Sequence, residues 1–163
     1  MTKPATGGCQ CGAVRYRVDG PFNNPHICHC RMCQKAFGNY FAALVGTLRE
    51  NLHWTKGQPS LFRSSSVVQR GFCRDCGTPL TYKAKSRPRI SVSIGSLDRH
   101  SEMKPAFQYG MESCEAWLGE ITSLPGTRTG EGDNGVGDTA ERYELIAKSN
   151  RQHPDHDTET WPG

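Results

Sequence analysis

The sequence lacks any long apolar run. No stretch approaches the roughly eighteen consecutive apolar residues that a membrane-spanning helix needs. The opening segment, MTKPATGGC, is polar and glycine-rich, so the hydrophobic part of a secretory signal is missing as well. These absences leave no candidate for a transmembrane helix or a secretory signal, and they predict that the chain has no membrane partner and stays in a reducing compartment, the cytoplasm.

Aromatic side chains and long helical patterns are also scarce. Aromatic residues form 9% of the chain and are not interleaved with its basic residues, which disfavours recognition of single-stranded nucleic acid by stacking. The 18 glycines and 10 prolines favour turns and short strands over long helices. At 163 residues, the chain has the length of one domain with one hydrophobic core.

Charge is distributed unevenly along the chain, whose net charge is +4. Residues 126–163 hold four basic and eight acidic residues, whereas the first 125 hold sixteen basic and eight acidic residues. A basic body can attract a small acidic substrate, nucleic acid or an anionic surface. Charge alone does not choose among these partners.

Short strands dominate the apolar pattern. Val14, Tyr16 and Val18 alternate with Arg15 and Arg17, which predicts a half-buried strand with the arginines on its outer face. Residues 1–8 and 22–27 have no such pattern and are predicted to be a flexible entry and a loop. A single helical turn is expected between residues 28 and 38. Further strands are predicted at 39–45, 48–54, 61–63, 67–72, 78–82, 89–94 and 107–109. The sequence therefore predicts a mainly β domain of short antiparallel strands with little helix.

The composition changes at residue 126. Residues 126–137 are glycine-rich and polar, and such a segment cannot bury enough apolar surface to offset the entropy of ordering it. We therefore expect one folded domain at 1–125, followed by a linker and a largely disordered tail at 126–163. A short helix is possible near 139–149, where Tyr143, Ile146 and Ala147 have helical spacing.

Eight cysteines in a reducing compartment indicate metal ligands or catalytic thiols rather than disulfides. Cys73 and Cys76 form a zinc-knuckle pattern, since a following glycine lets the turn point its amides at the sulfurs. Cys9 and Cys11, also followed by glycine, are the natural partners that complete a structural zinc site. An alternative joins Cys9 and Cys11 to two central cysteines, but it leaves the other pair without a complete ligand set.

The central segment, residues 28–33 (CHCRMC), crowds three thiols into six positions. Cys28, Cys30 and Cys33 supply three zinc ligands, and three protein ligands with one open position are typical of catalytic zinc. His29 lies between two ligands, so its side chain is expected to point away from the metal. The alternative is a closed site with a fourth protein ligand, for which the candidates are His26, His29, His53 and Cys114.

A zinc ion held by three thiolates is electron-rich and a weak Lewis acid, so it is poorly suited to activating water. It suits a substrate thiol as fourth ligand, because coordination removes the thiol proton and leaves a nucleophile. This chemistry makes or breaks a carbon–sulfur bond.

These motifs resemble the glutathione-dependent formaldehyde-activating enzyme family, which also includes centromere protein V. The resemblance rests on residues 8–16 (GCQCGAVRY), 28–33 with Gly38, and 72–80 (FCRDCGTPL), with weaker similarity at 95–98 (GSLD) and at Trp117 to Pro125. It covers about residues 7–125. Similar family members often have a histidine near the position of Gln108.

The resemblance implies a β-tent-like, zinc-ribbon-related fold with two zinc ions per chain. It implies a structural zinc on Cys9, Cys11, Cys73 and Cys76, and a second zinc on Cys28, Cys30 and Cys33 that the thiol of glutathione can approach. We expect this second zinc to be the more labile one. The reaction that it implies is condensation of formaldehyde with glutathione to S-hydroxymethylglutathione, a carbon–sulfur lyase activity.

Three hypotheses about function follow. The first is this zinc-dependent lyase, with the carboxylates of glutathione met by Arg15, Arg31, Lys35, Arg70 or the basic loop at 83–89. The second is a non-catalytic zinc-binding module for nucleic acid or protein. The third is a redox or metal-buffering protein with exposed thiolates.

Overall fold

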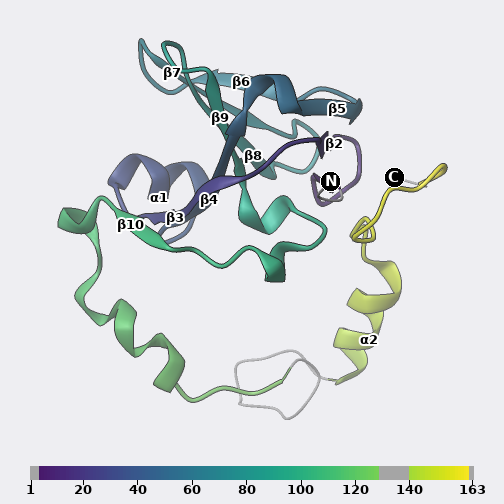
Figure 1. Cartoon of the computed structure of the whole chain (residues 1–163). Coiled ribbons are helices and arrows are strands. Elements are labelled where there is room, and N and C mark those ends of the chain that lie inside the picture. Colours follow the sequence, from purple (N-terminus) through teal and green to yellow (C-terminus); the bar gives the residue numbers. More distant parts are fainter. Residues whose placement is uncertain (1–3, 129–139, 162–163) are drawn as a thin grey trace. The chain divides into compact units, whose positions relative to one another are not determined.

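The computed structural model describes residues 4–128 and 140–161 (Figure 1). The chain forms two compact units. The first contains the residues up to Cys114 together with the segment that begins at Gln152, and the second is Glu115–Arg151. Within the described residues, no helix has both the length and the apolar character that crossing a bilayer requires.

The first unit is built from short strands, as the sequence predicts. In chain order the strands are β1 (Ala5–Gly8), β2 (Arg15–Val18), β3 (Asn23–Cys28), β4 (Ala42–Leu48), β5 (Leu52–Lys56), β6 (Ser60–Arg63), β7 (Val68–Phe72), β8 (Pro79–Ala84), β9 (Arg89–Ser93) and β10 (Phe107–Tyr109). Its helical elements are α1 (Arg31–Phe37) and the short 3-10 helices η1 (Arg49–Asn51), η2 (Ile94–Ser96), η3 (His100–Glu102) and η4 (Met111–Ser113). The prediction of a mainly β domain with little helix is confirmed.

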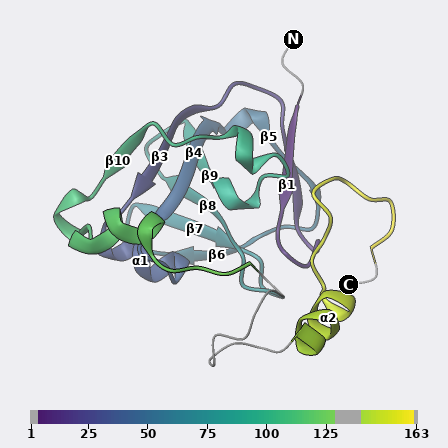
Figure 2. The ribbon, with the colours of Figure 1, turned by 90° about the horizontal axis from the view of Figure 1, so that it is seen from below.

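The strands form two sheets. The smaller sheet has the order β1-β2-β5, and the larger has the order β10-β3-β4-β9-β8-β7-β6. All pairs are antiparallel except β10 with β3, which run parallel along one edge (Figure 2). This edge matters for the candidate site, because β3 ends at Cys28 and β10 lies beside it.

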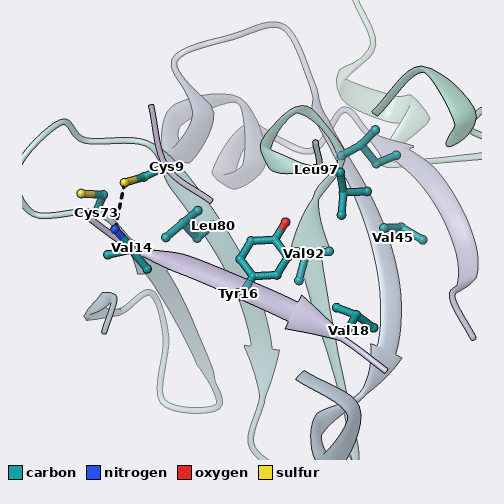
Figure 3. Close-up of a cluster of buried hydrophobic side chains, with 10 residues drawn as sticks. Cys9, Val14, Tyr16, Val18, Val45, Cys73, Leu80, Val92 and Leu97 are labelled. Carbon is teal, nitrogen blue, oxygen red and sulfur yellow. Dashed lines mark hydrogen bonds between the residues drawn. The ribbon is translucent and has the colours of Figure 1, made fainter. Parts of the chain in front are cut away.

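The main hydrophobic core takes side chains from both sheets. Val14, Tyr16 and Val18 are buried, as their alternation predicts, and they meet Leu80 and Val92 of the larger sheet. Figure 3 shows the Tyr16 ring pointing from β2 toward these residues, with the sulfurs of Cys9 and Cys73 at one end of the cluster. Burial of several such side chains contributes about 1.5–3 kcal/mol each.

Two predictions about local structure were wrong. Residues 1–8 were expected to be a flexible entry and residues 22–27 a loop, but β1 forms at Ala5–Gly8 and β3 at Asn23–Cys28. Pro25 lies in β3 where the register with β4 shifts between Asn23 and His26, so the missing amide interrupts no regular ladder there. β1 has little apolar character and is held by its pairing with β2.

The end of the chain contributes to the first unit. The amide of His153 donates to the carbonyl of Gln10 at 2.7 Å, and the His153 side chain is buried. Figure 2 shows this segment passing beside β1. The domain boundary at residue 125 and the disorder of the tail stay predictions. Most of the predicted glycine-rich linker lies outside the described residues.

The second unit contains η5 (Ala116–Ser123) and α2 (Ala140–Ser149). The helix α2 coincides with the one expected near 139–149. It has no buried residues, and its side chains include an ion pair between Lys148 and Glu144. Such an exposed pair contributes well under about 1 kcal/mol.

Candidate metal centres and cavity

Two matched turns carry the first cysteine set. In each turn the first cysteine closes a hydrogen-bonded loop: the Cys9 amide donates to the Val14 carbonyl, and the Cys73 amide donates to the Thr78 carbonyl, both at 2.9 Å. The trailing glycines, Gly12 and Gly77, have φ of 73° and 77°, a region that other residues rarely adopt. The positive φ expected from the sequence at these glycines is therefore present in both turns.

The four sulfurs of Cys9, Cys11, Cys73 and Cys76 all lie within 4.8 Å of one another. The Cys9–Cys11 and Cys11–Cys73 sulfur separations are 3.6 and 3.8 Å. A tetrahedral zinc ion with bonds of about 2.3 Å to sulfur requires sulfur separations of about 3.8 Å. These residues therefore fit a closed four-thiolate zinc site, and the alternative that mixes Cys9 and Cys11 with the central cysteines does not match the geometry.

Backbone and hydroxyl donors surround these sulfurs. The Val14 amide donates to Cys9 Sγ at 3.2 Å, and the Thr78 hydroxyl lies 3.1 Å from Cys76 Sγ. Burial raises the pKa of Cys9 to about 12. Burial also acts to raise the pKa of Cys76, but hydrogen bonds from the Thr78 hydroxyl and amide outweigh it and lower that pKa to about 6. Such donors favour the thiolate form that a metal ligand needs.

Residues 152–161, called the tail from here on, cover the first of these turns. A Cβ atom on Gly12 would lie 2.2 Å from Cδ2 of His153 and 3.1 Å from Cδ1 of Trp161, whereas a Cβ on Gly77 would meet nothing within 4 Å. Beside this contact, Arg15 is buried, and its guanidinium forms ion pairs with Asp98 at 2.6 Å and with Asp157 at 2.7 Å. The outward, exposed position expected for Arg15 was therefore wrong, because two carboxylates cover it.

The second cysteine set comes from one short segment. Cys28 is the last residue of β3, Cys30 is the N-cap of α1, and Cys33 lies in the first turn of α1. The end of the strand and the start of the helix therefore bring the three sulfurs together. These sulfurs lie within 4.8 Å of one another, and those of Cys28 and Cys30 are 3.5 Å apart. Among the described residues, no fourth cysteine, histidine or carboxylate joins the group.

The two more exposed thiols of this set differ electrostatically. Burial raises the pKa of Cys28 to about 12. Burial also acts to raise the pKa of Cys30, but the Cys33 amide, the neighbouring thiols and the positive charge of Arg70 together lower it. Arg70 lies close by, since its Nη2 donates to Cys33 Sγ at 3.5 Å.

The other candidates for a fourth ligand have different partners. His29 points away from the sulfurs, as expected: its Nε2 donates to Oε1 of Gln108 at 2.8 Å, and its amide donates to the Tyr109 carbonyl. His26 Nδ1 lies 2.7 Å from the Asn24 carbonyl, and His53 pairs with Asp19. Gln108 thus fixes the orientation of His29, a role that the sequence did not reveal.

A cavity of about 440 Å³ opens beside the second cysteine set. Its wall includes all three cysteines, and Arg70, Arg87 and Arg89 also line it. Cavities of about 300–1,000 Å³ are typical of small-molecule sites. A second hollow of about 570 Å³ lies next to it, shares Met32 and Arg70, and is lined by Arg31, Lys35 and several apolar side chains.

The structure separates the basic residues that were proposed to meet carboxylates. Arg70 and two residues of the basic loop, Arg87 and Arg89, line the cavity with the cysteines. Arg31 and Lys35 line the neighbouring hollow. Arg15 lines neither of these hollows and pairs instead with Asp98 and Asp157.

Known proteins resemble this chain in sequence and in fold. The family model described as glutathione-dependent formaldehyde-activating enzyme matches residues 4–113, which confirms the resemblance drawn from the motifs. A Halomonas elongata protein named "Putative glutathione-dependent formaldehyde-activating enzyme" is 33% identical over 82 residues, covering 45% of this chain and 52% of that protein. The chain therefore spans about half the length of that curated relative.

A crystal structure of a Rhodobacter sphaeroides protein has 23% identity and a TM-score of 0.50, covering 63% of this chain and 98% of that one. This last likeness is one of fold.

Proposed function

Because this chain belongs to the glutathione-dependent formaldehyde-activating enzyme family, we propose that it is a zinc-dependent carbon–sulfur lyase. Its proposed reaction joins glutathione and formaldehyde reversibly as S-hydroxymethylglutathione, or joins a related thiol and carbonyl compound. One observation carries the proposal: Cys28, Cys30 and Cys33 line a cavity, and their sulfurs have no fourth protein ligand among the described residues.

Two zinc ions serve different roles in this proposal. Cys9, Cys11, Cys73 and Cys76 would hold a structural ion, and Cys28, Cys30 and Cys33 would hold a second, more labile one. When bound, the second zinc supplies a position at which a substrate thiol is held as its thiolate. Since these thiols must stay reduced, the proposal places the protein in the cytoplasm.

The residues of the cavity would orient the substrate. Arg87 and Arg89, on the same cavity wall as the cysteines, can meet carboxylates of a thiol such as glutathione. The sulfur then attacks the carbonyl carbon, the carbonyl π pair moves to oxygen, and the proton released from the thiol reaches that oxygen through solvent. In the reverse direction the carbon–sulfur bond breaks and the same proton returns to sulfur.

Exchange spectroscopy tests the proposed reaction. Zinc-loaded protein is mixed with glutathione and formaldehyde, and the exchange rate between the free and adduct forms is measured by NMR. We expect the protein to raise this rate over the uncatalysed background, and Cys30→Ser to remove the increase. Cys114→Ser is the matched control, because this cysteine belongs to neither metal cluster, and it should keep the wild-type rate.

The result separates the lyase from the other two hypotheses. If wild-type protein with its full metal content does not exceed the background rate, the lyase proposal fails. A salt-dependent shift on mixing with DNA would then favour a binding module, and loss of metal from the second cluster under mild peroxide would favour a redox or metal-buffering role.

A further inference from the structure

Arg70 is a buried cation in the wall of the candidate site. Only 7% of its surface is exposed, and it borders both the cavity at the three cysteines and the neighbouring hollow. Its guanidinium contacts the Ser64 hydroxyl at 3.2 Å, Cys33 Sγ at 3.5 Å and the face of the Tyr82 ring at 5.1 Å. The Tyr82 contact follows from the register of β7 and β8, which pairs Arg70 with Tyr82.

This cation has an unusual set of partners. Within the described residues, no carboxylate forms an ion pair with Arg70, and its Nη1 is buried with no hydrogen-bond partner. A buried charge is costly unless an opposite charge compensates it. Of the three groups that contact the guanidinium, only Cys33 is a candidate metal ligand, and cysteine binds zinc as its thiolate. The three-cysteine cluster is therefore the negative charge that this arginine faces.

The charge of that cluster explains why a cation belongs there. Three thiolates around a divalent metal ion carry a net single negative charge. A substrate thiolate that joins them adds a second negative charge in a partly buried place, where charges of like sign repel strongly. We propose that Arg70 is a positioning residue that offsets this charge and so allows an anionic thiol to enter as the fourth ligand. This inference rests on the proposed function only in assuming that the fourth ligand is a thiol.

The first cysteine set has a different environment. The contacts that the described residues make to its sulfurs come from neutral donors, the Val14 amide and the Thr78 hydroxyl. Its fourth thiolate is supplied by the chain itself, whose fold holds all four ligands together. The second set must recruit its fourth ligand from solution, and it is the set at which, among the described residues, a buried guanidinium contacts a sulfur.

Thiol binding to the full chain tests the proposal without reference to lyase activity. In cobalt-loaded protein, the absorption of four-sulfur coordination reports each thiol that binds, and two probes are titrated: glutathione, which has carboxylates, and 2-mercaptoethanol, which has none. We expect Arg70→Gln to weaken both by about tenfold to a hundredfold, the range for a charged hydrogen bond. Arg70→Lys, which keeps the charge but not the planar guanidinium, should lose clearly less affinity for both thiols than Arg70→Gln. Arg63→Gln, an exposed arginine of β6 that lines neither hollow, is the control.

The outcomes decide among distinct roles. Loss of affinity for glutathione alone would make Arg70 a ligand of substrate carboxylates and overturn the proposal. An equal loss of thiol affinity in Arg70→Lys and Arg70→Gln would indicate a structural role and would also overturn the proposal. Wild-type affinity in Arg70→Gln, or no thiol binding by the wild-type protein, would overturn it as well. Failure of formaldehyde exchange with thiol binding intact would overturn the lyase and leave the role of Arg70 standing.

A second variant keeps the test decisive if Arg70→Gln does not fold. Ser64→Asp places a carboxylate where the hydroxyl now contacts Arg70 Nε, so it neutralises the guanidinium without removing it. It should weaken both thiols as Arg70→Gln does, and Ser64→Asn, which has the same size without the charge, should not. Equal binding by the two Ser64 variants would contradict the proposal.

Discussion

At the scale of single residues, Asp98 joins segments that are far apart in the sequence. It accepts hydrogen bonds from the Thr6 hydroxyl of β1 and from two nitrogens of Arg15 in β2, the latter at 2.9 and 2.6 Å. Arg15 also contacts Asp157 in the tail. The Arg15 and Asp98 side chains are each 5% exposed, so loss of Arg15 would leave the buried Asp98 carboxylate without its cation, and loss of Asp98 would leave the buried guanidinium with Asp157 alone.

Asp98 should make stability depend on pH. Burial acts to raise its pKa, but hydrogen bonds from Arg15 and Thr6 outweigh it and lower the pKa. The carboxylate therefore stabilises the fold above the ordinary pKa of about 4 and loses this contribution as pH falls through the lower folded value. We expect Asp98→Asn to be about 3 kcal/mol less stable near neutral pH and the difference from wild type to shrink below about pH 4, measured by urea unfolding.

The exposed ion pair between Arg99 and Glu102 provides the control for this measurement. Glu102→Gln should change the unfolding free energy little at any pH, because exposed pairs contribute little. Acid also protonates cysteines and releases metal, but it does so in every variant, so the difference between wild type and Asp98→Asn isolates the carboxylate. A difference that stays constant with pH would contradict the assignment.

Single residues also show what sequence patterns can and cannot predict. The buried face of Val14, Tyr16 and Val18 follows from alternation, since period two is a local property of a strand. The same alternation predicted Arg15 to be exposed. It failed there because burial of Arg15 depends on Asp98 and Asp157, carboxylates that lie 83 and 142 residues away in the sequence.

At the scale of elements, the tail and the first cysteine turn form one packed unit. His153 and Trp161 lie over Gly12, and the matched turn at Gly77 has no such cover. Both glycines have positive φ, so alanine at either position brings a similar backbone strain of about 1 kcal/mol. Only at Gly12 does the added methyl group also collide with the tail.

This pair of glycines gives a direct measure of tail docking. We expect Gly12→Ala to lower the free energy of unfolding by more than Gly77→Ala, with an excess of about 1–2 kcal/mol, measured by denaturant unfolding of zinc-loaded protein. In a chain that ends at Arg151, the two substitutions should have equal effects. An excess that persists in the shortened chain would show that the tail is not its cause.

The two cysteine clusters should release metal in a fixed order. The first set is closed by four sulfurs, and the second has three from a single segment, so the second holds its ion with one ligand fewer. We expect zinc-loaded protein to contain two zinc ions and a mild chelator to remove one without loss of β circular dichroism. The remaining ion should leave only as the protein unfolds. A single class of zinc, released in one step with unfolding, would contradict this order.

The sequence predicted most elements but not all of those that shape the site. Strands with alternating or β-branched residues, such as β7 and β9, were placed within a few residues of their observed bounds. β3 was missed because Pro25 and polar residues hide its pairing with β4, and the contact between His153 and Gln10 was missed because it depends on a distant loop. The cysteine sets were found because ligand spacing is visible in the sequence itself.

At the scale of the whole molecule, the first metal site joins two turns that are far apart in the sequence, since Cys11 and Cys73 are separated by 62 residues. Structural zinc contributes about 10–16 kcal/mol in zinc-finger peptides, which matches or exceeds the total stability of about 5–15 kcal/mol of a typical domain. The second site lies at the junction of β3 and α1, and its sulfurs are contributed by one segment. The two sites should therefore differ in what their loss does to the fold.

Ligand substitutions should separate a structural from a functional metal site. We expect Cys73→Ser to unfold the first unit or to lower its melting temperature by more than about 10 °C, since the effect of a lost zinc ligand exceeds several kcal/mol. Cys30→Ser should shift it by only a few degrees while losing one zinc ion, measured by thermal unfolding with metal analysis. Similar melting temperatures for the two variants would contradict the division of roles.

The spacing of the two cysteine sets also bears on the order in which the chain folds. Cys28 and Cys30 are 2 residues apart, whereas Cys11 and Cys73 are separated by 62. Closing a long loop costs conformational entropy, and such contacts form slowly. The short segment can therefore capture a metal ion while the chain is still unfolded, and the four-cysteine site can do so only after distant turns have met. When metal is scarce, the labile functional site competes for the ion on which the fold itself depends.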